Sequence, residues 1–122
     1  MTVEATFWGH AAVRIKTDKA VLLIDPFLSN NPQAAVRPDE VQADYIVVTH
    51  GHGDHLGDAE AIAKQTGATV IANAEISNYL GRKGIKTHAL HIGGGFNFPF
   101  GRVKLTIAHH GSSLPDGSYG GN

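Results

Sequence analysis

Side chains that could bind a metal ion gather in one short segment of this sequence. His50, His52, Asp54 and His55 fall within six consecutive residues of a chain that has eight histidines. Neutral imidazole is the commonest metal ligand in proteins, and a carboxylate adds a hard oxygen beside it. The spacing lets His50 and His52 converge on one ion, while Asp54 and His55 face a neighbouring ion. Two ions about 3.5–4 Å apart can share a hydroxide, the nucleophile of many hydrolases.

The residues on either side predict that this cluster lies between a strand and a helix. Positions two residues apart point to different faces of a helix, so we expect the ligands in a loop, which Gly51 and Gly53 allow to turn tightly. The apolar, β-branched run 45–49 before the loop is typical of a strand buried on both faces. After it, 58–65 has the pattern of a helix with Asp58 as its N-cap. Such a turn belongs at the carboxyl end of a sheet, where open α/β folds place their sites. An adventitious cluster of exposed histidines is the alternative, which the buried strand disfavours.

The remaining elements predict an α/β or α+β fold. Strands come first, then strands alternate with helices, and a hairpin follows, which predicts a mixed β-sheet covered by helices on one face. We expect the first three strands to form an antiparallel meander and the last strand to run into the pair at 109–110. The expected strands are 2–8, 11–16, 20–24, 45–49, 69–72, 85–90, 96–100 and 102–108, and the expected helices are 58–65 and 74–80.

Length and composition restrict the class of protein. With 122 residues, the chain is expected to form a single domain over residues 1–122. The absence of cysteine excludes disulfides, thiolate zinc sites and a cysteine nucleophile. A net charge of −1 with scattered basic residues argues against nucleic acid as a partner. No signal peptide and no apolar run of about 18 residues is visible, so we expect a cytoplasmic protein with no membrane span.

Four segments carry a resemblance to a known family. The segment T-H-G-H-G-D-H-L-G-D at 49–58 resembles the H-x-H-x-D-H signature of the metallo-β-lactamase superfamily. The segments F-W-G-H-A-A-V-R-I (7–15), L-L-I-D-P-F (22–27) and A-H-H-G-S-S (108–113) resemble its branch of metal-dependent hydrolases with unassigned substrates. Relatives of that branch include L-ascorbate-6-phosphate lactonase and N-acylphosphatidylethanolamine phospholipase D. The resemblance implies an αββα sandwich of two similar halves, of which this chain corresponds to the N-terminal half.

The resemblance also implies roles for individual histidines of the first metal site. His50, His52 and a later histidine in the pattern A-x-H-[GS]-S would hold the first metal. The segment 108–112 fits this pattern best with His110 as the ligand and His109 at the variable position, and His109 remains the alternative. His109 would otherwise contact substrate or support the ligands.

The second metal and the catalytic roles follow from the same resemblance. Asp54 and His55 would hold the second metal, and Asp54 would also orient the attacking water, which makes Asp54 and His52 the catalytic candidates. The family's bridging aspartate and further histidine have no counterpart among these residues.

Two residues are expected to support the site from outside the metal ligands. His10 follows a strand and is expected beside the cleft, where it would support a ligand or contact substrate; a structural histidine is the alternative. Asp25 ends a buried strand and could accept the second N–H of a metal-bound imidazole, or serve only as a turn residue.

The function predicted is that of a metal-dependent hydrolase. A metal-activated hydroxide would attack an ester, lactone or phosphodiester bond of a small-molecule substrate. The cofactor would be one or two divalent cations, zinc first, with manganese, iron or nickel as alternatives. The second hypothesis is a metal-binding half-domain with little or no turnover, assembling as a homodimer or with a complementing C-terminal half. Nucleic-acid processing is the least favoured hypothesis because the chain has no basic stripe.

Overall fold

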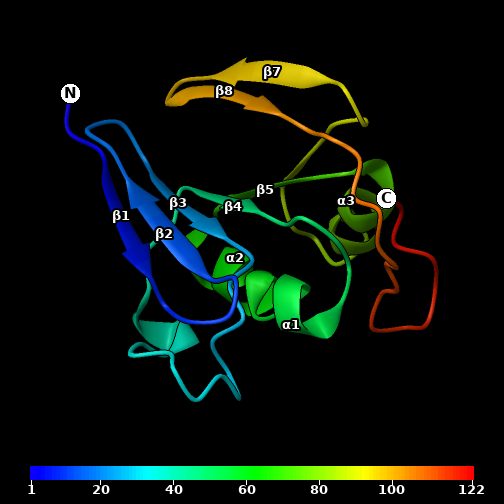
Figure 1. Cartoon of the computed structure of the whole chain (residues 1–122), viewed down its shortest axis with the longest axis horizontal. Helices are drawn as coiled ribbons and strands as arrows, with labels where there is room; N and C mark the ends of the chain where they lie inside the picture. The colour runs from blue at the N-terminus through cyan, green and yellow to red at the C-terminus, as the bar shows by residue number, and fades with distance from the viewer.

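Six strands form one mixed sheet in the computed structural model, which describes residues 1–122 (Figure 1). Their order in the sheet follows the chain, from β1 to β6. The first three pair antiparallel as a meander, and β3 to β6 run parallel. The six strands are β1 Glu4–Phe7, β2 Val13–Lys16, β3 Val21–Ile24, β4 Tyr45–Val47, β5 Thr69–Ala72 and β6 Thr87–Ala89.

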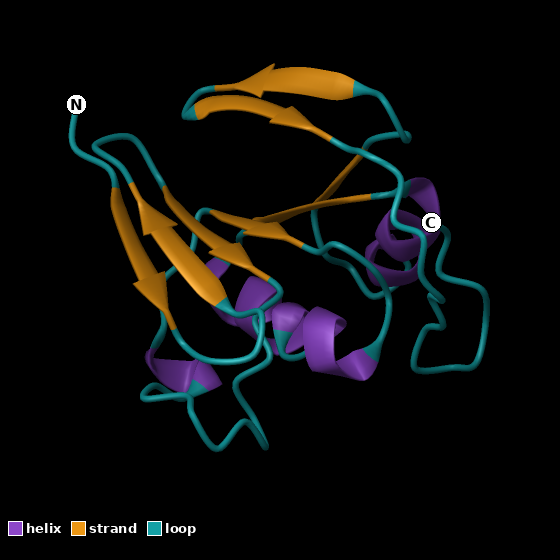
Figure 2. Ribbon diagram, viewed as in Figure 1, coloured by secondary structure: helices purple, strands orange, loops and turns teal.

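Helices cover one face of this sheet, which confirms the predicted fold class (Figure 2). Leu23, Ile46 and Val70 stand opposite one another in neighbouring strands and are fully buried against the helices. They belong to a single core cluster that includes Leu56 of the first helix and Ile62 of the second. The helices are α1 Gly53–Leu56, α2 Ala59–Thr66, α3 Ala74–Gly81 and the 3₁₀ helix Pro38–Glu40. The longest of them has eight residues, so none could cross a membrane.

A hairpin of β7 (Gly95–Phe98) and β8 (Gly101–Lys104) lies over the opposite face of the sheet (Figure 1). The ring of Tyr45 packs edge-on against Phe98 and Phe100, with ring centroids 5.7 and 4.7 Å apart. Strand β4 therefore lies between the helices and the hairpin, as its apolar sequence predicts. The hairpin covers β4 on this face of the sheet but leaves the edge strand β1 more exposed, and Phe7 of β1 is 67% exposed.

The structure corrects two expectations about the helices and strands that contain or precede the candidate ligands. His55 and Asp54 lie in α1, a single helical turn closed by the Leu56 amide donating to the His52 carbonyl at 2.8 Å, so only the first half of the cluster is a loop. The final strand stops at Lys104 because its partner β7 begins at Gly95, and no strand continues to 108.

Two side chains also differ from expectation. Asp58 occupies the N-cap position of α2, but its side chain makes no cap hydrogen bond. Its carboxylate instead accepts from the Leu28 and Ser29 amides, both at 2.8 Å, and from the Ser29 hydroxyl at 2.7 Å. The alternation of Phe96, Phe98 and Phe100 in the sequence favours one buried face, yet Phe96 is 45% exposed on the hairpin, beside His88.

Candidate metal centre

The loop that follows β4 is fastened to the C-terminal segment of the chain. The Gly51 amide donates to the hydroxyl of Ser112 at 2.9 Å. A Cβ on Gly51 would lie 3.0 Å from Leu114 and from the Ser113 carbonyl, so the two segments approach as closely as a glycine allows. This contact brings His110, which is distant in sequence, beside the histidines of the loop.

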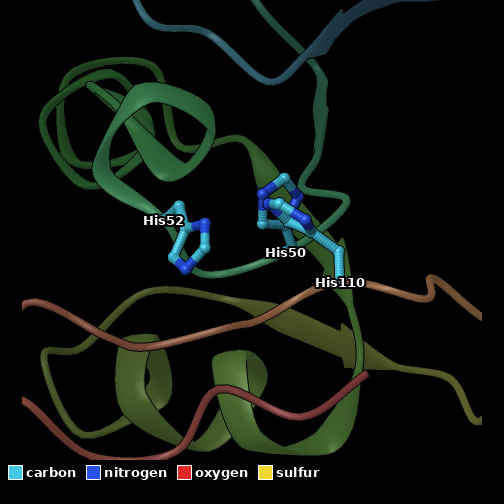
Figure 3. Close-up of side chains that lie close together, drawn as sticks. All are labelled: His50, His52 and His110. Carbon is cyan, nitrogen blue, oxygen red and sulfur yellow. The ribbon is translucent and has the colours of Figure 1, made fainter.

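Three histidines face one another at this junction (Figure 3). The ring centroids of His50 and His52 are 5.0 Å apart, those of His50 and His110 are 4.9 Å apart, and those of His52 and His110 are 5.0 Å apart. One ring nitrogen from each lies within 4.8 Å of the other two. His109, the alternative third histidine, is exposed and belongs to no such group.

Hydrogen bonds define which nitrogen of His50 faces this cluster. The Thr49 hydroxyl donates its one proton to a carboxylate oxygen of Asp25, at 2.6 Å. The same hydroxyl oxygen lies 3.0 Å from Nδ1 of His50 and can therefore only accept from it. This arrangement places the proton of the neutral imidazole on Nδ1 and leaves the Nε2 lone pair free.

The free nitrogen of His50 fits a metal ligand. Nε2 is buried and has no hydrogen-bond partner, although buried polar atoms are almost always paired. Burial lowers the pKa of His50, and repulsion from His55 lowers it further, so the ring stays in the neutral form that can donate its lone pair to a cation. A divalent cation among the three rings would satisfy this atom.

A second group of candidate ligands adjoins the first. It consists of His10, Asp54 and His55, and the rings of His50 and His55 are only 4.1 Å apart between the two groups. Nδ1 of His55 lies 2.7 Å from a carboxylate oxygen of Asp25. An ionised carboxylate can only accept, so His55 carries its proton on Nδ1 and presents Nε2 to Asp54, with 4.0 Å between Nε2 and Oδ1.

Asp25 therefore supports one histidine of each group, His55 directly and His50 through the Thr49 hydroxyl. Its side chain is 2% exposed and accepts from the Thr49 amide at 2.8 Å as well as from the Thr49 hydroxyl and His55. Its backbone has φ +45, a left-handed conformation that ends β3 abruptly and turns the carboxylate under the loop. Buried carboxylates behind imidazoles fix the tautomer and orientation of metal ligands.

Sequence reasoning missed the part played by Thr49. Nothing about a threonine at the end of an apolar strand distinguishes it from a strand residue, and only its place next to His50 was a signal. Ser112, two residues after His110, accepts a hydrogen bond from the Gly51 amide. His88 lies apart from both groups, packed on Phe96 and Phe98.

Comparisons with known proteins identify the family of this chain. The family model of the metallo-beta-lactamase superfamily matches residues 5–119. A UPF0173 metal-dependent hydrolase of Carboxydothermus hydrogenoformans is 56% identical over 115 residues, which are 94% of this chain and 51% of the relative. A protein of the same description from Flavobacterium johnsoniae is 47% identical over 121 residues, 98% of this chain and 54% of the relative.

A solved structure is similar over nearly the whole chain. Igni18, a metallo hydrolase from Ignicoccus hospitalis, superposes with a TM-score of 0.82 at 31% identity, covering 97% of this chain and 53% of that protein. The chain thus spans about half the length of the relatives that it matches. On the family model, the sequence relatives and the shared fold, this chain belongs to the metallo-beta-lactamase superfamily.

Proposed function

We propose that this chain forms the metal-binding part of a metal-dependent hydrolase, with His50, His52 and His110 as ligands of one divalent cation. The buried, unpaired Nε2 of His50 beside two further imidazoles is the observation that carries this proposal. Asp54 and His55 would contribute to a neighbouring second cation. Mixed imidazole and carboxylate ligation favours zinc, with manganese, iron or nickel as the alternatives.

The residues of this chain would prepare the site for hydrolysis. A bound divalent cation would supply acidification of water and stabilisation of developing negative charge. Asp25 and Thr49 hold His55 and His50 as Nδ1–H tautomers, so their Nε2 atoms need no proton loss before ligation. The carboxylate of Asp54 is half-exposed at the rim, where it can accept a hydrogen bond from the attacking water and orient it.

The substrate class proposed is a small molecule with an ester, lactone or phosphodiester bond. We expect the zinc-loaded chain to hydrolyse a member of a panel such as p-nitrophenyl acetate, a simple lactone and bis(p-nitrophenyl) phosphate. Chelator and His52→Ala should each abolish that turnover, whereas His88→Ala, a histidine outside both groups, should leave it unchanged. Turnover that survives both chelator and His52→Ala would contradict the proposal.

A second function, a metal-binding half-domain that assembles as a homodimer, is favoured by the open face of the sheet. Phe7 stands opposite Val13, which stands opposite Ile24 in β3, so the three share the sheet face toward the hairpin, which leaves the β1 edge of that face open. Phe7 is 67% exposed on an edge strand, an arrangement that invites pairing with another chain. A second copy, or a polypeptide that supplies the other half of the fold, would cover it.

Sedimentation equilibrium tests this assembly. We expect a dimer of the wild-type chain that Phe7→Ser weakens, because the substitution removes apolar area from the proposed interface. Tyr119→Ser is the matched control, since Tyr119 is similarly exposed but lies in the C-terminal segment. A monomer at every concentration would contradict self-association.

A further inference from the structure

We propose that His10 is the third protein ligand of the second cation site, beside Asp54 and His55. This inference rests on the proposed function and extends it to a residue outside the histidine-rich loop. Nε2 of His10 lies 3.2 Å from Oδ2 of Asp54, and one donor atom from each of the three residues lies within 4.8 Å of the others. Two ligands of one tetrahedral zinc are roughly 3.3 Å apart, given metal–ligand distances of about 2.0–2.1 Å.

The β1–β2 turn holds the His10 imidazole at this place. Gly9 and His10 both have left-handed backbones, with φ +97 and +58, and a non-glycine residue there costs about 1–2 kcal/mol. The buried side chain of Asn31 ties the turn to the loop after β3, donating to the Gly9 carbonyl at 3.3 Å and to the Phe27 carbonyl at 2.9 Å. The imidazole then packs edge-on against Phe27, with centroids 5.6 Å apart.

The three side chains form a chemically suitable set. Nδ1 of His55 donates to Asp25, which leaves Nε2 free to bind a cation. The ring centroid of His55 lies 5.0 Å from that of His10. The two oxygens of Asp54 face different rings, Oδ2 toward His10 and Oδ1 toward His55. Two imidazoles and one carboxylate are a ligand set that zinc and manganese accept, and the exposure of His10 and Asp54 leaves room for water.

A simple hydrogen bond between His10 and Asp54 is the competing role, and a pair of variants separates the two. His10→Gln can still donate a hydrogen bond to Asp54 from about the position of Nε2, but an amide is a poor ligand for zinc or cobalt. His10→Glu offers a carboxylate ligand on the same carbon skeleton. Both variants carry the same backbone cost at φ +58, so a difference in metal binding between them reports the side-chain amide or carboxylate and not the backbone.

Titration of the metal-free chain with cobalt(II) chloride, followed by visible absorption and by metal analysis after dialysis, provides the test. We expect two cobalt ions per wild-type chain, one for His10→Gln with the second site weakened about tenfold or more, and two again for His10→Glu. His91→Gln, at an exposed histidine outside both groups, should match the wild type.

Failure of this inference can be distinguished from failure of the proposed function. If His10→Gln binds two cobalt ions with wild-type affinity and absorption, or if the wild type binds only one, His10 is not a ligand and the first site stands. If His110→Ala binds cobalt as the wild type does, or if the wild type binds none, the proposed function itself fails.

Discussion

The buried carboxylate of Asp25 is shared by both groups of candidate ligands. It accepts from the imidazole of His55 directly and reaches His50 through the hydroxyl of Thr49. Substitution by asparagine keeps the left-handed backbone, which asparagine tolerates, but removes the charge and offers an N–H to His55. We expect Asp25→Asn to weaken zinc binding about 10- to 100-fold, measured by calorimetric titration.

Asp18→Asn provides the control for that measurement, because Asp18 is exposed in the turn before β3. Equal zinc affinity of Asp25→Asn and the wild type would show that the carboxylate does not support the ligands.

The lowered pKa of His50 makes a prediction about stability and pH in the metal-free protein. The unfolded chain binds a proton near pH 6.5, whereas burial and the neighbouring His55 hold the native pKa below that value. Between those two pKa values the unfolded state binds more protons than the native state. The contribution of His50 to stability is therefore fully present above about pH 6.5 and is lost as the pH falls through the window below it.

Urea unfolding in chelator from about pH 7.5 to pH 5 measures this effect. We expect the wild type to lose more stability on acidification than His50→Gln, whose side chain does not titrate, while His109→Gln follows the wild type. Parallel curves for the wild type and His50→Gln would contradict the assigned burial of a neutral imidazole.

At the scale of elements, the turn that ends α1 controls where the loop after β3 lies. Gly57 has φ +49, and a Cβ there would stand 2.6 Å from the Pro26 carbonyl oxygen and 2.7 Å from Cα of Phe27. Because both contacts are with backbone, Gly57→Ala must displace the segment next to Asp25. We expect a loss of about 3 kcal/mol in the free energy of unfolding, measured by urea denaturation, and weaker zinc binding.

Gly67→Ala is the matched control at the end of α2. Gly67 also has a left-handed backbone, φ +78, but nothing lies within 4 Å of its would-be Cβ. We expect Gly67→Ala to lower the free energy of unfolding by only about 1 kcal/mol and to leave zinc binding unchanged. Equal losses for the two variants would mean that close packing at Gly57 is unimportant.

Periodicity in the sequence predicted the strands and helices well where each element is buried by its neighbours. The strand predicted at 45–49 is present over Tyr45–Val47 and the helix predicted at 58–65 over Ala59–Thr66, because the strand lies between two layers. The end of β8 at Lys104 depends on where its partner begins, which no pattern within the strand itself records. The role of Asp58 was missed for a similar reason, since its partners at 28–29 are distant in sequence.

At the scale of the whole molecule, the fold brings together residues from its beginning, middle and end. The turn after β1 carries His10, the end of β3 carries Asp25, and the C-terminal segment brings His110 to the loop after β4. The sequence named all of these residues through local motifs and family resemblance. It could not show that the Thr49 hydroxyl links the Asp25 carboxylate to His50, because the contact between Thr49 and Asp25 depends on the register between β3 and β4.

The most direct test of the metal centre is zinc content per chain after dialysis against a defined free zinc concentration, for the wild type, His110→Ala and His109→Ala. We expect at least one tightly held zinc in the wild type and in His109→Ala, and loss of that zinc in His110→Ala because only two of the three imidazoles remain. Wild-type zinc content in His110→Ala, or no retained zinc in the wild type, would contradict the assignment of His50, His52 and His110 as a metal site.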